Sequence, residues 1–351
     1  MRRGMVGLEI GTHNIKIIEA KKKGMKWEVI HTARIETPKE SVVNGELISQ
    51  EEVVCAIKEV IQKKKIKEKK VYLLIDSSDV IAREIEVNGS NHKYLKELLN
   101  YRIEEYLPID ARNYEVDFEV IEEIEKEGRK VVKLLAVAAP KALVKQYIEL
   151  SELLELKLKG ISIQAANLGK AFRMISREET EEELTTLMID IGGQATDLTI
   201  VKGQNTRLTQ KIEFGSHEIN KKIMEIFDED DLEEVEYFKQ RYAAIYEEEH
   251  LLDEDFYGNY ISQIIKADMN HKLIEGIQKF IRFYHMNSHE KIDKVYLIGG
   301  GSGIKHIDSY IERATQIEVE ILKQTEYFIN SEEFEDEIPY FANLLGLVRG
   351  A

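Results

Sequence analysis

The stretch that decides the fold is "VGLEIGTHNIKIIEA", residues 6–20, because it places two charged residues inside an apolar hairpin. Its two apolar segments have the composition of β-strands, and Gly11 with the polar residues after it predicts a tight turn between them. Glu9 stands two residues before that glycine, and Lys16 stands on the returning strand. Because a buried carboxylate is costly without a partner, Glu9 and Lys16 need a common explanation.

The same plan returns in the second half of the chain, in "LMIDIGGQATDLTI", residues 187–200. When the two stretches are laid on each other, Glu9 matches Asp190 and Gly11 matches Gly192, and both returning strands are apolar. An internal repeat of one supersecondary unit indicates two similar domains. We therefore expect an α/β chain whose two halves present their turns to each other.

The two turns and their charges suit a phosphate ligand. Backbone N–H groups in a tight turn point several donors at one place, so two facing turns would clamp phosphate groups. Glu9 and Asp190 would then hold Mg²⁺ through its water shell, and Lys16 would neutralise phosphate oxygens directly. His13 suits either a phosphate contact or a solvated side chain. The residues expected at the phosphates are Gly11, Thr12, His13, Asn14 and Lys16 in the first hairpin, and Gly192, Gly193, Gln194 and Thr196 in the second.

A third segment, "LIGGGSGIKHI" at residues 297–307, ends a predicted strand with a run of glycines and opens a predicted helix. Such a turn lets the backbone pass close to a flat or anionic group, and it also occurs for packing alone. The Gly-Lys-Ser/Thr ending of a P-loop is missing. By itself the segment therefore leaves both interpretations open.

Composition excludes several classes of function. A chain of 351 residues with 43% hydrophobic residues can bury the cores of about two domains. The net charge of −16, with acidic tracts at 178–183, 228–236 and 247–255, repels nucleic acid. No apolar run approaches the roughly 20 residues of a membrane span, and the first residues lack the apolar stretch of a signal peptide. We expect a cytoplasmic protein without a nucleic-acid partner and without direct membrane insertion.

The order of hairpin, junction, hairpin, helical insertion, glycine turn and terminal helix resembles the actin-like ATPase fold, in which two ribonuclease-H-like domains face each other. Five segments carry the resemblance: "EIGTHNIK", "DIGGQATD", "LIGGGSG", "ISIQAANLGKAF" and "FANLLGLVRG". The last two would be the connecting helices. The implied domains are a first actin-like subdomain at 1–80 with 156–185 and 335–351, a small α+β insertion at 81–155, and a second actin-like domain at 186–334 whose insertion 216–290 is mainly helical.

Within that superfamily the chain resembles the PilM family of type IV pilus assembly proteins, relatives of the cell-division protein FtsA. The resemblance rests on "REIEVNGSNHKYLKELLNYRIEEYLPIDARNYEVDFEVI", residues 83–121, which is similar to the family's SHS2-type insertion, and on "LEEVEYFK", residues 232–239. It implies a scaffold that binds ATP and Mg²⁺ and turns ATP over slowly at most. Such a protein would lie at the inner face of the membrane, docked through a groove near the insertion to the cytoplasmic N-terminal tail of a PilN-like bitopic protein. The family also suggests a homo-oligomeric ring.

The resemblance assigns roles to further residues. Glu236 and Lys239 would lie beside the adenosine, together with Gly299, Gly300, Gly301 and Ile304 of the glycine-rich segment. Gln164 would orient the attacking water, with Asp190 and Glu9 as the other catalytic residues; bridging the strand and the helix at this junction is an equally good interpretation of Gln164. Glu9 is one methylene longer than the family's usual aspartate, so nucleotide binding should survive more readily than hydrolysis.

Two other functions stay open. FtsA shares the fold, but FtsA proteins usually carry a linker and an amphipathic membrane helix after the segment with which this chain ends, so we expect the pilus role. A sugar- or acetate-type kinase shares the ATPase core, but we find no second substrate-binding signature in the sequence. His285 and His289 have the i, i+4 spacing of a zinc pair; without a third ligand in view, we expect surface or helix-end histidines.

Overall fold

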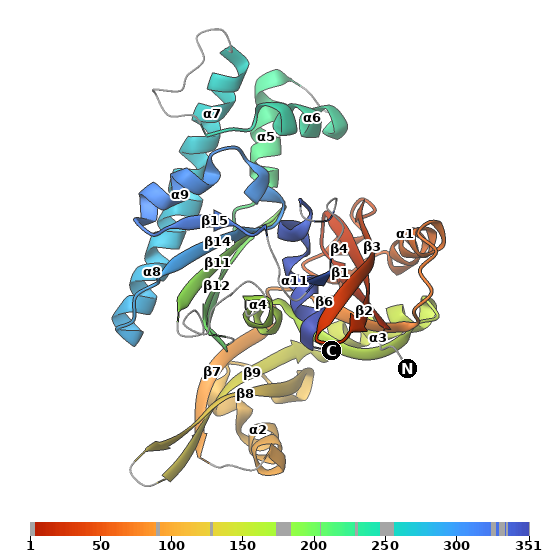
Figure 1. The fold of residues 1–351 in the computed structure, drawn as a ribbon, viewed down its shortest axis with the longest axis vertical. Coiled ribbons are helices and arrows are strands. Elements are labelled where there is room, and N and C mark those ends of the chain that lie inside the picture. The colour runs from red at the N-terminus through yellow and green to blue at the C-terminus, as the bar shows by residue number, and fades with distance from the viewer. Residues whose placement is uncertain are drawn as a thin grey trace.

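The computed structural model describes residues 4–88, 92–126, 129–172, 184–203, 205–228, 231–245, 256–323, 328–329, 334 and 336–350. The acidic tracts expected at 178–183 and 247–255 lie outside these residues. Two sheets with helices on their faces lie side by side, and a smaller sheet lies beyond them at one end of the long axis (Figure 1). The expected α/β plan of two halves and a small insertion is therefore present.

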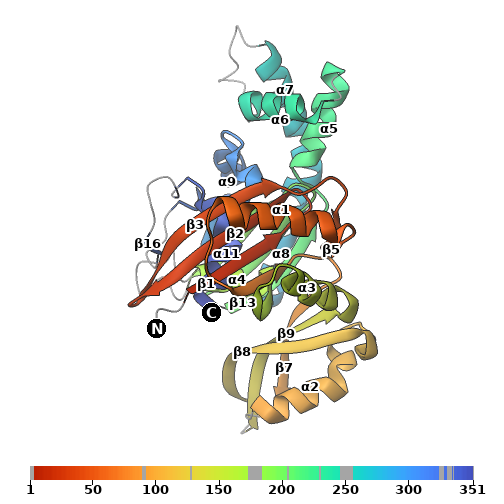
Figure 2. The same cartoon turned by 90° about the vertical axis from the view of Figure 1, so that its right-hand side faces the viewer.

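The first half is built on a six-stranded sheet with the strand order β10-β6-β1-β2-β3-β16. β1 lies inside it because every residue of "GMVGLEI" is buried. Val6, Leu8 and Ile10 share one core with helices α1 and α3, which cover that face of the sheet (Figure 2). The elements of this half are β1 (Gly4–Ile10), β2 (Asn14–Lys23), β3 (Lys26–Glu36), the small hairpin β4 (Val42–Val43) and β5 (Glu46–Leu47), α1 (Gln50–Lys63), β6 (Lys70–Ile75), α3 (Lys141–Leu153), β10 (Lys157–Ile163) and β16 (Phe328–Ile329).

The second half is built on a five-stranded sheet with the strand order β13-β12-β11-β14-β15. Leu187 and Ile189 of β11 share a core with α8 and α9, and helices α5, α6 and α7 extend away from the sheet at the end opposite the insertion (Figure 1). The elements are β11 (Thr185–Ile191), β12 (Thr196–Lys202), β13 (Asn205–Ile212), α5 (Ser216–Phe227), α6 (Leu232–Tyr242), α7 (Phe256–Asp268), a π-helical segment (Met269–Ile274), α8 (Glu275–Ser288), β14 (Lys294–Ile298), a 3₁₀ turn (Gly300–Gly303), α9 (Ile307–Thr315) and β15 (Val319–Ile321).

The insertion is a three-stranded sheet with the order β7-β9-β8, covered by α2, whose Leu95, Leu99 and Ile103 pack against it. We expected α3 to complete this insertion. Instead, the apolar face of α3, with Leu143 and Tyr147, packs in the larger core of the first half. In the same way β16, which the expected bounds assign to the second half, pairs with β3 of the first sheet. The elements of the insertion are β7 (Ile81–Asn88), α2 (His92–Tyr106), a 3₁₀ turn (Ala111–Asn113), β8 (Tyr114–Lys126) and β9 (Arg129–Pro140).

Two helices, α4 (Gln164–Phe172) and α11 (Ile338–Gly350), lie between the two sheets (Figure 1). Their shared core joins Met5 of the first sheet to Met188 of the second, so the halves are connected by continuous apolar packing and not by a loose linker. Among the described residues, no helix combines the length and the apolar character needed to cross a membrane.

Replacing Gly346 by alanine is expected to lower the free energy of unfolding by about 3 kcal/mol, since overpacking at a rigid contact forces the backbone to shift. A Cβ atom at Gly346 of α11 would lie 2.2 Å from the backbone oxygen of Asn167 in α4. Gly276→Ala in α8 is the matched control, because its Cβ would meet only the end of the Ile212 side chain, 2.6 Å away. Urea denaturation that found Gly346→Ala as stable as this control would contradict the close helix crossing.

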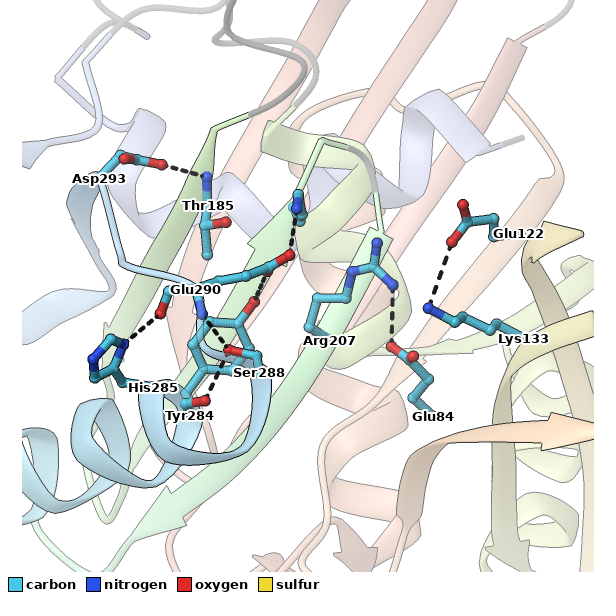
Figure 3. Close-up of polar contacts among 11 residues, drawn as sticks. Glu84, Glu122, Lys133, Thr185, Arg207, Tyr284, His285, Ser288, Glu290 and Asp293 are labelled. Atoms are coloured by element: carbon cyan, nitrogen blue, oxygen red, sulfur yellow. Dashed lines mark hydrogen bonds and ion pairs between the residues drawn. The ribbon is translucent and has the colours of Figure 1, made fainter. Parts of the chain in front are cut away.

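Ion pairs join the insertion to the rest of the molecule. Arg207 of β13 lies 3.4 Å from the Glu84 carboxylate of β7, as Figure 3 shows. Lys170 of α4 lies 3.0 Å from the Glu119 carboxylate of β8. The insertion therefore contacts both the second half and a connecting helix. A movement of one half relative to the other would change the position of the insertion.

Candidate functional site

The two repeated hairpins have the same backbone geometry. In each one the N–H of the glycine after the strand donates to the carbonyl three residues on: Gly11 to Asn14 and Gly192 to Ala195, both at 3.0 Å. Ile10 pairs with Ile15 across the first hairpin as Ile191 pairs with Thr196 across the second. The internal repeat predicted from the sequence is thus confirmed in the backbone.

Strand alternation explains why the two acids face the connecting helices. Successive side chains of a strand point to opposite faces, so Glu9 shares the face of Met5, and Asp190 shares the face of Met188. Both methionines lie in the core around α4 and α11. Two acids from strands in different halves are therefore directed toward the same interior region.

Glu9 and Lys16 are directly opposite each other in the register of β1 and β2, and Lys16 Nζ lies 2.6 Å from Glu9 Oε1. Burial raises the pKa of Glu9, against the opposing effect of Lys16. Burial lowers the pKa of Lys16, but the Glu9 and Asp190 carboxylates outweigh it and leave that pKa raised. The other carboxylate oxygen of Glu9 is buried and has no hydrogen-bond donor among the described residues. The pair is thus a buried lysine cation beside an incompletely satisfied acid.

Asp190 is held by one amide from each connecting helix. Gln164 Nε2 of α4 donates to Asp190 Oδ2 at 2.8 Å, and Asn343 Nδ2 of α11 donates to the same oxygen at 2.9 Å. Burial raises the pKa of Asp190, while Lys16 and Asn343 oppose that shift. Asn343 was not among the expected site residues; its signal in the sequence is a single amide in the otherwise apolar "FANLLGLV", and the structure buries it.

A second lysine bridges the two halves. Lys211 Nζ of β13 lies 2.9 Å from Asp76, just after β6 of the first half, and 3.2 Å from Asp197 of β12. Burial and the neighbouring Asp76 raise the pKa of Asp197 to about 7, although Lys211 opposes the shift. In the first hairpin the residue opposite Glu9 is the cation Lys16. In the second hairpin the residue opposite Asp190 is the acid Asp197, so the cross-strand partner carries the opposite charge.

These residues form one acid–lysine cluster, and its charges do not cancel. It consists of four carboxylates and two lysines: Glu9, Asp76, Asp190, Asp197, Lys16 and Lys211. With all groups ionised the excess is two negative charges, which a divalent cation would offset. Over the described ranges, no three Asp, Glu, His or Cys side chains stand close enough to hold a metal together. The buried Glu9 Oε2, which has no hydrogen-bond donor among the described residues, is the kind of oxygen that could accept from the water shell of Mg²⁺.

Asp197→Asn is expected to stabilise the protein at pH 8 by about 2 kcal/mol, measured with a chelator present. The folded pKa of about 7 lies above the ordinary value of 3.8, so the folded state binds more protons in this window and loses stability as the pH rises through it. Asparagine removes that loss. The gain should vanish near pH 4, and an equal gain at both pH values would contradict a titrating Asp197.

His13 packs over the second turn. A Cβ atom at Gly193 would lie 1.9 Å from His13 Cδ2, so a larger residue there would require the ring to shift. The centroids of the His13 and His217 rings are 3.5 Å apart. Lys239 and Glu236 of α6 form an ion pair at 2.5 Å, and both act on the His13 pKa, so they lie near the first turn. The structure thus brings His13, the second turn and the expected adenosine pair into one region.

The glycine-rich turn packs directly on the cluster. Gly299 has φ +80°, its N–H donates to the Pro339 carbonyl at 2.9 Å, and a Cβ there would lie 2.2 Å from Asp190 Oδ1. A Cβ at Gly301 would likewise be too close to its neighbour, 2.2 Å from Ile191 Cγ2. A pocket lies beside this turn, and none of its lining residues belongs to the acid–lysine cluster. Those residues are Ser302, Gly303, Ile321, Lys323, Asp336, Pro339 and Tyr340.

Two of the expected site residues, Thr196 and Ile304, make contacts within the second half. The Thr196 hydroxyl donates to the Phe214 carbonyl at 2.8 Å, and the Ile304 side chain is buried in the core of the second half. Gln194 and Gly300 are exposed. Thr12 and Asn14 are half-buried in the first turn.

The two histidines considered for zinc lie at the end of α8. His285 Nδ1 lies 3.0 Å from the Glu290 carbonyl oxygen (Figure 3). His289 is the C-cap residue, with φ +59°. Both are exposed, which agrees with helix-end histidines.

Comparison with known proteins gives the family and the fold. A family model described as type IV pilus assembly protein PilM matches residues 7–338. The chain is similar to a solved PilM–PilN type IV pilus biogenesis complex, with a TM-score of 0.84 at 21% identity over 100% of this chain and 99% of that chain.

Two more distant structures share the fold. The ethanolamine utilization protein EutJ from Carboxydothermus hydrogenoformans has a TM-score of 0.59 at 12% identity, over 99% of this chain and 90% of that chain. MreB5 of Spiroplasma citri bound to AMPPNP has a TM-score of 0.57 at 12% identity, over 99% of this chain and 95% of that chain. The fold is therefore that of the actin-like ATPases, as the sequence predicts.

Proposed function

The chain belongs to the PilM family of type IV pilus assembly proteins, and from this premise we propose that it is a nucleotide-binding scaffold of a type IV pilus assembly machine. The observation that carries the nucleotide part is the acid–lysine cluster between the halves, with its excess of two negative charges beside the two repeated glycine turns. The related MreB5 structure was solved with AMPPNP. A ligand placed there would contact both halves at once.

The residues of the two turns take the phosphate groups in this proposal. The backbone N–H groups of residues 12–13 and 193–194 would be the phosphate donors, because those of Gly11 and Gly192 donate within their own turns, and Lys16 adds a cation on the returning strand β2. Glu9 and Asp190 would hold Mg²⁺ through its water shell, and the ion would offset the phosphate charge. Gln164 and Asn343 fix Asp190 in position through the bonds described above.

The adenosine would lie between α6 and the glycine-rich turn, next to Glu236 and Lys239. Gly299, Gly300 and Gly301 would provide a backbone surface, and the neighbouring Ile304 packs in the core of the second half. Gln164 remains the candidate for orienting an attacking water. Its amide already donates to Asp190, and this supports slow turnover at most.

The partner we propose is the cytoplasmic N-terminal tail of a PilN-like bitopic membrane protein, because the similar solved complex contains PilM with PilN. The tail would dock in a groove near the SHS2-type insertion, and the protein would thereby lie at the inner face of the membrane. Closure of the halves around a nucleotide would reach that groove through the Arg207–Glu84 and Lys170–Glu119 contacts. We also propose that copies of the chain assemble into a homo-oligomeric ring.

Affinity capture from detergent-solubilised membranes of the source organism, with Mg-ATP present, tests this function. Recovery of a bitopic pilus protein through its cytoplasmic tail is the expected result. Recovery of division proteins would instead assign the chain to the FtsA branch. An empty capture together with metabolite-dependent ATP consumption would favour a kinase. A capture repeated with Lys16→Met/Glu9→Gln shows whether the partner depends on nucleotide.

A further inference from the structure

We propose that His13 and His217 form a proton-linked contact for the terminal phosphate of a nucleoside triphosphate. The two rings come from opposite halves of the molecule and touch across the phosphate turns. This inference rests on the proposed nucleotide site, and it adds a regulation of that site by protons. The sequence allows either a phosphate contact or a solvated side chain for His13, and His217 was not among the expected site residues.

Both rings are fixed to the turns through the backbone. Thr37 N–H donates to the His13 carbonyl at 2.8 Å, which anchors the first turn to the end of β3. His217 N–H donates to the Gly193 carbonyl at 2.8 Å, and Ser216 N–H donates to the Gly192 carbonyl at 3.0 Å. The start of α5 is therefore bound to the second turn, and a change at either turn moves its histidine.

The His13 ring fills the space in which a phosphate would approach the second turn. Its Cδ2 atom lies 1.9 Å from the position that a Cβ of Gly193 would take, so the ring lies directly against this turn. A phosphate group held by both turns must displace this ring or accept a hydrogen bond from it. Since a phosphate offers only acceptor oxygens, a protonated imidazole, with two donors, is the better partner.

The charges around the pair favour neutral rings before a ligand binds. Burial and then Lys239 of α6 lower the pKa of His13, while Glu236 of α6 opposes them. Burial, the neighbouring His13 ring, Lys239 and Lys221 of α5 lower the pKa of His217 to about 4, and Glu236 again opposes. A phosphate dianion adds negative charge beside both rings, which favours their charged forms. Binding should therefore take up a proton.

Calorimetric titration with Mg-ATP in two buffers of different ionisation enthalpy, at pH 6 and pH 8, measures that proton directly. The wild type is compared with His13→Asn/His217→Asn, and His285→Asn serves as a control histidine far from the turns. We expect the ratio of ATP affinities between pH 6 and pH 8 to be about tenfold larger in the wild type than in the double variant. The protonation of ATP itself between pH 6 and pH 8 affects the affinity of every variant equally, so it cancels when the variants are compared. Mg-ADP, which lacks the terminal phosphate, should show no such difference.

The outcomes separate this inference from the proposed function. If the wild type and the double variant bind ATP with the same proton uptake, the histidine contact is wrong and the nucleotide site stands. If the wild type binds neither nucleotide at either pH, the proposed site fails and the histidine contact with it. If His285→Asn changes proton uptake as much as the double variant does, the effect is not local to the turns, and the inference is overturned.

Discussion

Replacing Lys16 by methionine is expected to lower the free energy of unfolding at pH 8 by about 3–5 kcal/mol and to weaken Mg-ATP binding by about 100-fold. The substitution leaves Glu9 buried with neither oxygen paired, and it removes the cation that also faces Asp190. Breaking one side of a buried ion pair costs far more than removing both partners. Urea denaturation measures the first effect, and nucleotide titration measures the second.

The double variant Lys16→Met/Glu9→Gln separates stability from binding. It removes both charges of the pair, so most of the stability lost in Lys16→Met should return. Binding should stay lost, because the phosphate cation and one acid of the proposed Mg²⁺ shell are absent. A double variant as unstable as Lys16→Met would contradict the pairing, and one that binds like the wild type would place the phosphates elsewhere.

Gly299→Ala is expected to cost about 3–5 kcal/mol of stability, whereas Gly300→Ala, one residue later, should cost less than about 1 kcal/mol. Gly299 has φ +80° and ψ 175°, a conformation essentially restricted to glycine, and a Cβ there would lie 2.2 Å from Asp190 Oδ1. At Gly300 the nearest atom would be Tyr340 Cε1 at 3.7 Å, an ordinary contact. Thermal unfolding of the two variants side by side checks the difference. Equal melting temperatures would contradict the close packing of the glycine-rich turn against Asp190.

Local pattern was sufficient to predict the hairpins and their charges. The alternation of apolar residues, the glycine after each acid and the repeated spacing are all contained within 15 residues, so they placed Glu9 and Lys16 on adjacent strands. The direct ion pair between the two side chains, at 2.6 Å, was not among the expectations. The facing of Glu9 and Asp190 followed from the repeat. The hairpins and the direction of their charged side chains agree with the structure because successive side chains of a strand always point to opposite faces of the sheet.

The missed residues are those that only the tertiary fold brings together. Asp76 lies 135 positions before Lys211 in the chain, and Asn343 lies 153 positions after Asp190. Nothing local marks them as partners. The packing of α3 could not be predicted for a related reason: its helical pattern shows that it has an apolar face but not which of two neighbouring cores buries it.

Equilibrium dialysis of labelled ATP with Mg²⁺ against the wild type and Lys16→Met/Glu9→Gln tests the central claim most directly, namely that the acid–lysine cluster between the halves is the nucleotide site. The account predicts saturable binding of one ATP per chain by the wild type and no measurable binding by the folded double variant. Absence of binding to the wild type, or equal binding to both proteins, would contradict it.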